Sequence, residues 1–202
     1  MRRLVWMTLL ALACAAGPAA AQPPALPDAR PLWHAPKQDP LTPMRLRGSV
    51  GHSTARLEAR ARWVSEVQIL GMLTYRDGWE GGLAPVDLAV GWGPMADRAA
   101  LDAIAFTQND RFYYWKILAN GPWNARDVSL HSANIHIIPA NPSVLAQVRA
   151  LRPGDRVVLE GLLVDAEKPD GLWWRTSLVR ADTGPGACEI LLLTGLHRPM
   201  GP

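Results

Sequence analysis

The sequence predicts a mainly β protein with two short helices, folded as a small barrel or a strongly curved antiparallel sheet, of which an OB-like barrel is one form. Three observations support this class. Short stretches rich in branched and aromatic residues recur along the chain, glycine and proline turn signals separate them, and only two stretches have the cap and apolar spacing of a helix. About 150 residues remain once both ends are set aside, a comfortable size for one core.

The first half of the domain is expected to hold two strands, a short helix and a third strand. Strands are predicted at residues 64–75 (VSEVQILGMLTY) and 86–92 (VDLAVGW), each followed by a glycine-containing turn. Asp97 can cap a short helix that would run to Ile104. Residues 111–118 (RFYYWKIL) are the most aromatic strand candidate.

The second half begins with a strand at residues 131–140 (HSANIHIIPA), which Pro139 ends. Asn141 followed by Pro142 is a good helix start, and that helix would run to about residue 151. A turn and strand follow at residues 153–166, and a KPDG turn at residues 168–171 leads into a return strand at residues 172–179. A final strand is predicted at residues 188–194.

The amino-terminal residues predict export. Two arginines precede about 13 uncharged, mostly apolar residues and then small ones, which is the layout of a secretory signal peptide. The apolar stretch is shorter than the roughly 20 residues of a membrane-spanning helix. Cleavage fits best after Ala21, so we expect a signal peptide at residues 1–21 and a periplasmic or secreted protein. As an alternative, residues 11–14 (ALAC) look like a lipobox, which would place a lipid anchor on Cys14.

A proline-rich tether is expected between the signal peptide and the domain. Residues 22–44 hold seven prolines, each of which fixes a backbone dihedral and removes a hydrogen-bond donor, so neither sheet nor helix is predicted there. A single β-rich domain would then span residues 45–196, followed by a tail at residues 197–202.

Charge and motifs restrict the partners. The chain has 21 Lys and Arg against 18 Asp and Glu, and removing the signal peptide takes away two arginines, which lowers the net charge from +3 to +1 and predicts no nucleic-acid partner. No later stretch reaches 18 apolar residues, so no integral membrane span is expected. No phosphate-binding loop or zinc motif is present, and we expect neither cofactor nor metal. The expected partner is an envelope component or a small molecule.

The polar residues of HSANIHIIPA form the first candidate site, and they are His131, Ser132, Asn134 and His136. On a strand the last three share one face, whereas the apolar residues between them point the other way. The two histidines are five positions apart, an odd spacing that puts them on opposite faces, so they form no ready-made metal pair. The polar row could line a cleft, or its side chains could cap neighbouring backbone groups.

Cys188 is the second candidate, because it is the only cysteine left after the signal peptide. It could be a reactive thiol with His131 or His136 as its base. The adjacent Glu189 would raise the thiol pKa, which opposes activation. Burial as a small apolar side chain beside the following leucines is therefore the favoured interpretation.

Trp173, Arg175 and Ser177 form the third candidate. Adjacent tryptophans on a strand point to opposite faces, and if Trp174 faces the core, Trp173 shares the outer face with Arg175 and Ser177. Such a surface could bind a sugar ring or a peptide. Alternatively, Trp173 is covered by another segment.

Four phrases of the sequence also carry a resemblance. GWGPMAD at 91–97, RFYYW at 111–115, HSANIHIIPA at 131–140 and GACE at 186–189 together resemble an uncharacterised family of small exported bacterial proteins. The resemblance covers residues 63–195. It implies that these phrases belong together, but it implies no activity.

These features favour a binding or interaction module of the bacterial envelope that recognises a small molecule, a glycan or a peptide. The alternative is a small periplasmic hydrolase that uses His136 or His131. An enzyme would place one of these imidazoles in a concave pocket, within hydrogen-bond reach of a nucleophile, an acid or a metal. A binding module would instead have a shallow polar and aromatic groove.

Overall fold

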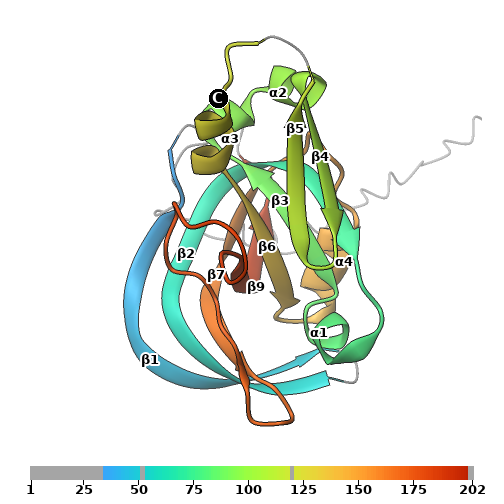
Figure 1. Ribbon diagram of the computed structural model, residues 1–202. Helices are drawn as coiled ribbons and strands as arrows, with labels where there is room; N and C mark the ends of the chain where they lie inside the picture. The colour runs from blue at the N-terminus through green and yellow to red at the C-terminus, as the bar shows by residue number, and fades with distance from the viewer. Residues whose placement is uncertain (1–33, 51–52, 119–120, 200–202) are drawn as a thin grey trace, which may run out of the picture.

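The computed structural model describes residues 34–50, 53–118 and 121–199, and this part of the chain is mainly β (Figure 1). The large curved sheet contains β1 (Lys37–Val50), β2 (Ser53–Thr74), β3 (Val86–Gly91), β6 (Ser132–Pro139), β7 (Arg156–Glu167), β8 (Trp173–Trp174) and β9 (Glu189–His197). A separate hairpin contains β4 (Ile104–Asn109) and β5 (Phe112–Ile117). The helices are α1 (Gly78–Leu83), α2 (Arg98–Ala103), α3 (Ala125–His131) and α4 (Pro142–Arg149), with a 3-10 turn at Gly93–Ala96. The predicted class, mainly β with a strongly curved sheet, is confirmed.

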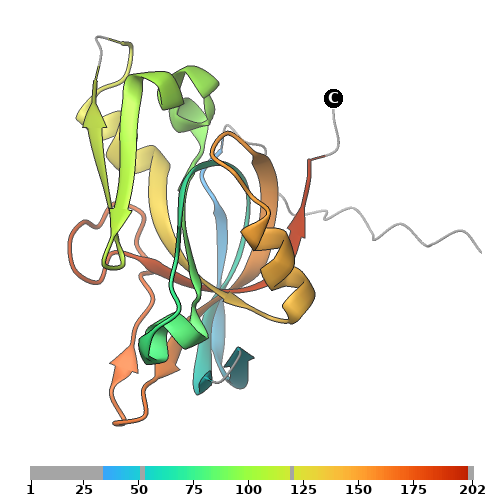
Figure 2. The ribbon, with the colours of Figure 1, turned by 90° about the vertical axis from the view of Figure 1, so that its right-hand side faces the viewer.

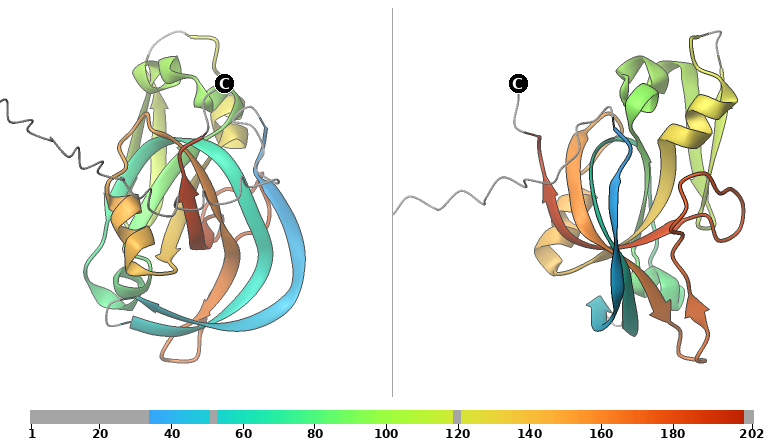
Figure 3. Two further views of the ribbon diagram at one scale, coloured as in Figure 1. Left: turned by 180° about the vertical axis from the view of Figure 1, so that it is seen from behind. Right: turned by 90° about the vertical axis from the view of Figure 1, so that its left-hand side faces the viewer.

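Five strands of the large sheet pair in a closed circuit. Their order is β2, β3, β6, β9 and β7, and β7 pairs back with β2. All these pairs are antiparallel except β6 with β9, which is parallel. Seen from behind, β1 and β2 curve around β7 and β9 (Figure 3). An OB-like arrangement of this ring stays a prediction.

The main core is built from side chains of all five ring strands. Alternate residues of a strand point to opposite faces, so each strand contributes one row to the core. Representative fully buried members, one from each strand, are Trp63, Leu88, Ile135, Leu159 and Leu191. Val144 and Val148 of α4 pack on the same cluster, which ties this helix to the ring.

β2 begins at Ser53, whereas the sequence predicted a strand only from residue 64. Residues 55–63 (ARLEARARW) alternate between buried positions and partly or fully exposed ones, as on a half-buried strand. Alanine and charged residues have weak strand propensity, which hid the alternation. The polar face is stabilised by ion pairs to β7, such as Arg60 with Asp165 at 2.6 Å.

β1 corrects the expected tether. Residues 37–44 were predicted to lack sheet structure, but they belong to β1, which pairs with β2 from Lys37 onward. The prolines are tolerated because β1 is an edge strand and its register shifts between Pro40 and Met44. The expected signal peptide, the possible lipid anchor at Cys14 and residues 22–33 of the tether lie outside the described residues.

The return strand predicted at residues 172–179 is also shorter than expected. Only Trp173 and Trp174 pair with β7, as β8. The Asp165 carboxylate accepts a hydrogen bond from the Thr176 amide at 2.9 Å, which replaces a strand partner and turns the chain away. Residues 175–188 then form an irregular segment, called the 175–188 segment below.

The two predicted helices are present and capped as expected. Asp97 accepts a hydrogen bond from the Ala99 amide at the start of α2, and Asn141 accepts one from Val144 at the start of α4. α1 and α3 were not predicted. None of the helices in the described ranges is long and apolar enough to cross a bilayer.

The β4–β5 hairpin stands with α2 and α3 at one end of the molecule (Figure 2). The sequence predicted β5 but not β4. Its turn uses Asp110 and Arg111, whose φ angles of 50° and 71° lie in the left-handed region that few residues other than glycine adopt. The usual glycine turn signal is therefore missing from this hairpin.

Candidate functional site

A cavity of about 280 Å³ lies where the hairpin, β6 and the 175–188 segment meet. β5 contributes the aromatic residues Phe112, Tyr113 and Trp115, and α3 contributes Ser129. β6 supplies part of its polar row. The 175–188 segment and the start of β9 supply the charged side chains and Cys188. Segments far apart in the sequence thus converge on one concave site.

The predicted polar row of β6 lies on one face, but only part of it reaches the cavity. Ser132 and Asn134 line the cavity, whereas the apolar residues of the opposite face, Ile135 and Ile137, belong to the main core. Ser132 Oγ donates to the Val128 carbonyl at 2.6 Å and lies 3.1 Å from the Tyr113 hydroxyl. This residue therefore both caps backbone and joins β6 to the aromatic wall.

Asn134 connects three segments around the cavity. Its Oδ1 accepts from Gln108 Nε2 at 2.8 Å, and its Nδ2 donates to the Arg111 carbonyl at 3.1 Å. The same Nδ2 lies 3.9 Å from Cys188 Sγ. The amide fixes the hairpin against β6 and orients the cysteine beside it.

His136 lies outside the cavity lining. Its side chain is 3% exposed, its Nδ1 is 2.9 Å from Asp87 Oδ1, and its ring lies 4.9 Å from that of Trp174. The same Asp87 oxygen accepts from Arg111 Nη1 at 2.8 Å, and the Arg111 guanidinium stacks 3.7 Å over Tyr75. These residues form a buried polar cluster next to the cavity, on the same face of the sheet as Ser132 and Asn134.

His131 is held at the end of α3. Its Nδ1 donates to the Asp127 carbonyl at 2.9 Å, an arrangement that suits the carboxyl end of a helix. Its ring lies against Gly93, where an added Cβ would come within 3.0 Å of the imidazole. His131 and His136 therefore lie in different surroundings and make separate contacts within the fold.

Cys188 lines the cavity as a protonated thiol. Its pKa is raised to about 11, mainly by burial and to a smaller extent by the nearby carboxylates of Glu189, Asp87 and Asp182. The Asn134 amide acts in the opposite direction. A nucleophilic cysteine needs a lowered pKa, so this environment opposes thiolate chemistry at neutral pH.

Arg180 and Glu189 form an ion pair in the cavity wall. Arg180 comes from the 175–188 segment and Glu189 begins β9, where its side chain is 3% exposed. Burial raises the pKa of Glu189 to about 7, although the Arg180 charge lowers it. Within the described residues, Glu189 Oε2 and the Nε and Nη1 atoms of Arg180 have no hydrogen-bond partner.

The predicted surface of Trp173, Arg175 and Ser177 does not form as a unit. Trp173 is half-buried, Arg175 is exposed and pairs with Asp165 at 3.2 Å, and Ser177 is buried with its hydroxyl donating to Asp182 at 2.6 Å. The alternation fails because the chain leaves the sheet after Trp174. Trp174 is partly buried and packs on a smaller apolar cluster that includes Leu57, Val164 and Ile190.

Sequence reasoning missed Tyr113 and Glu189 as residues of the site. Glu189 carried a usable signal, because an acid at the start of an apolar strand is costly to bury unless it is paired or protonated. Tyr113 carried no such signal, since its place depends on how the hairpin packs. Within the described ranges, no group of three His, Cys, Asp or Glu could hold a metal ion.

Comparison with known proteins identifies no match for this chain. No family model, no curated protein and no solved structure matches the chain. The resemblance to small exported bacterial proteins therefore stays a prediction.

Proposed function

We propose that this protein is a binding module of the bacterial envelope and that the cavity between β5, β6 and the 175–188 segment holds its small-molecule ligand. One observation carries the proposal: aromatic, hydroxyl and charged side chains from separate segments converge on a cavity of about 280 Å³. Ligand sites are usually concave, with apolar walls and a few placed polar groups. The location in the periplasm, or outside the cell, rests on the amino-terminal sequence.

The contacts of the candidate catalytic groups favour binding over hydrolysis. His131 and His136 each donate or share a hydrogen bond within the fold, and neither lines the cavity. The Cys188 thiol stays protonated at neutral pH. A hydrolase would need a nucleophile and a base within hydrogen-bond reach of each other at the ligand.

A cavity-filling substitution tests this proposal. Ala187 lines the cavity, so Ala187→Trp would occupy it, whereas Ala99→Trp on exposed α2 is the matched control. Ligand-observed NMR with a mixture of small polar fragments should detect binding to the wild type and to Ala99→Trp. Binding should be lost in Ala187→Trp. The proposal fails if no fragment binds, or if Ala187→Trp binds as the wild type does.

A further inference from the structure

The walls of the cavity differ in chemistry. One wall is formed by residues of β5, where Tyr113 and Trp115 share one face of the strand and Phe112 precedes them. The facing wall carries Arg180, Asp182 and other polar residues. A ligand that fills this space must therefore present an apolar face to aromatic rings and polar groups along its edge.

The charges of the cavity disfavour a charged ligand. Its ionisable groups near neutral pH are one cation, Arg180, and two acids, Asp182 and Glu189. Arg180 is already paired with Glu189, so an anion would gain little from it and would meet Asp182. The formal charge of the three groups lies between 0 and −1, depending on the protonation of Glu189. The electrostatic attraction of the cavity for a cation is therefore weak.

The hydrogen-bonding groups favour a ligand that both donates and accepts. The unpaired atoms of Arg180 and Glu189 are buried in the wall, so a ligand would meet the other polar groups of the lining, among them the Asn134 amide, which both donates and accepts. An ammonium can only donate and a carboxylate can only accept, whereas a hydroxyl group does both. Hydroxyl side chains of Tyr113, Ser132 and Thr183 also line the cavity.

We infer that the ligand is a neutral ring bearing hydroxyl groups, namely one sugar residue, either free or at the end of a glycan. The sugar's C–H face would lie on the aromatic wall, and its hydroxyl groups would meet the polar wall. This inference rests on the proposed function, because it names the class of ligand for the same cavity.

The test compares ligand classes on the full-length protein. The sugar probes are D-glucose, N-acetyl-D-glucosamine and the linear trisaccharide of each. Tetramethylammonium chloride and sodium acetate represent cations and anions. Saturation-transfer NMR measures the binding of each probe. At least one sugar should bind saturably, and its affinity should not change with salt, since screening weakens only charged partners. Tighter binding of a trisaccharide would identify a glycan end, and equal or tighter binding of a monosaccharide would identify a free sugar.

Two neighbouring tyrosines provide the matched variants. Tyr113 lines the cavity, while Tyr114 is 55% exposed on the other side of the same strand. Tyr113→Leu should weaken sugar binding by about tenfold or more, and Tyr114→Leu should not change it. Thermal unfolding checks that both variants fold. If Tyr113→Leu does not fold, Ala187→Trp takes its place with the same expected loss.

The outcomes separate this inference from the proposed function. Sugar binding that survives Tyr113→Leu or Ala187→Trp contradicts the inference. So does binding of tetramethylammonium or acetate without any sugar. Fragments that bind in the cavity while all sugars fail would overturn the ligand class and leave the proposed function standing. Failure of both fragments and sugars would overturn both.

Discussion

Among single residues, Glu189 is the one whose protonation the fold changes most clearly near neutral pH. Its carboxyl group is buried beside Arg180, and burial raises its pKa from the ordinary 4.5 to about 7. The folded protein therefore holds this proton more tightly than the unfolded chain does. Because the folded state binds more protons across this range, its stability should fall as pH rises from about 4.5 to 7.

Glu189→Gln should remove this dependence. The amide cannot ionise, so the free energy of unfolding should no longer fall across that pH window by the roughly 1–3 kcal/mol that ionisation of the buried carboxyl group costs. Urea unfolding at several pH values measures the slope. Glu66→Gln on β2 serves as the control and should keep the wild-type slope. A variant at Glu189 with an unchanged slope would contradict the assigned pKa.

At the level of the elements, the packing of β9 against β7 leaves no room for a side chain at Gly161. A Cβ built on this glycine would lie 2.2 Å from the Leu192 carbonyl oxygen, which is backbone and cannot turn aside. The pair also shifts register between Glu160 and Gly161. The glycine is thus required by the close contact between two ring strands.

Gly161→Ala should lower the free energy of unfolding by roughly 1–3 kcal/mol, because β9 must move to accept the methyl group. Gly71→Ala on β2 is the comparison, since its Cβ would meet Gln108 Oε1 at 2.9 Å, the end of a flexible side chain. Its loss should be smaller. Chemical denaturation of both variants checks this, and equal losses would show that the close approach is not what matters.

The elements also show what the sequence could and could not predict. Strands with apolar or aromatic runs, such as β3 and β5, and helices with a clear cap, such as α2 and α4, follow from local chemistry. β4 did not, because its turn at Asp110 and Arg111 lacks glycine. The β6 polar row was predicted, but the places of Tyr113 and Glu189 in the cavity wall were not. Tyr113 and Glu189 meet it only after the hairpin and β9 have packed, which no local pattern specifies.

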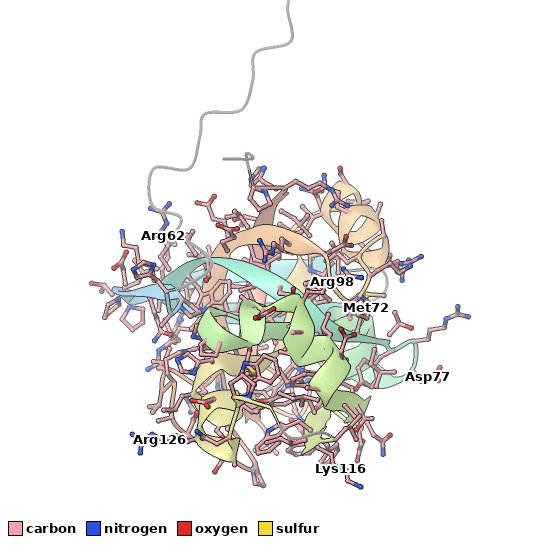
Figure 4. The ribbon with its side chains drawn as sticks, turned by 90° about the horizontal axis from the view of Figure 1, so that it is seen from above. Arg62, Met72, Asp77, Arg98, Lys116 and Arg126 are labelled. Atoms are coloured by element: carbon pink, nitrogen blue, oxygen red, sulfur yellow. The ribbon has the colours of Figure 1, made fainter. Side chains whose placement is uncertain are left out.

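Across the whole molecule, β1 protects an open edge of the ring. β2 pairs with β7 on one side and with β1 on the other over much of its length. Without β1, a row of backbone groups on β2 would lie unpaired, and exposed strand edges recruit other chains. Figure 4 shows Arg62 on the outer surface beside β1, whereas Arg126 lies away from it on α3.

Truncation at two points tests the role of β1. A chain that begins at residue 37 keeps β1 and should remain well folded and unassociated. A chain that begins at residue 51 lacks β1 and should unfold at lower temperature and self-associate through the β2 edge. Light scattering after gel filtration, together with thermal unfolding, distinguishes them. Equal behaviour of the two chains would mean that β1 is dispensable.

The place of β9 in the ring has a consequence for how the polypeptide acquires its structure. β9 is the last strand in the described part of the chain, yet it lies between β6 and β7 and completes the circuit. Contacts between distant parts of a chain form slowly, because a large loop must close first. The newly made polypeptide therefore cannot close the ring until β9 has left the ribosome, after every other strand of the circuit has been made.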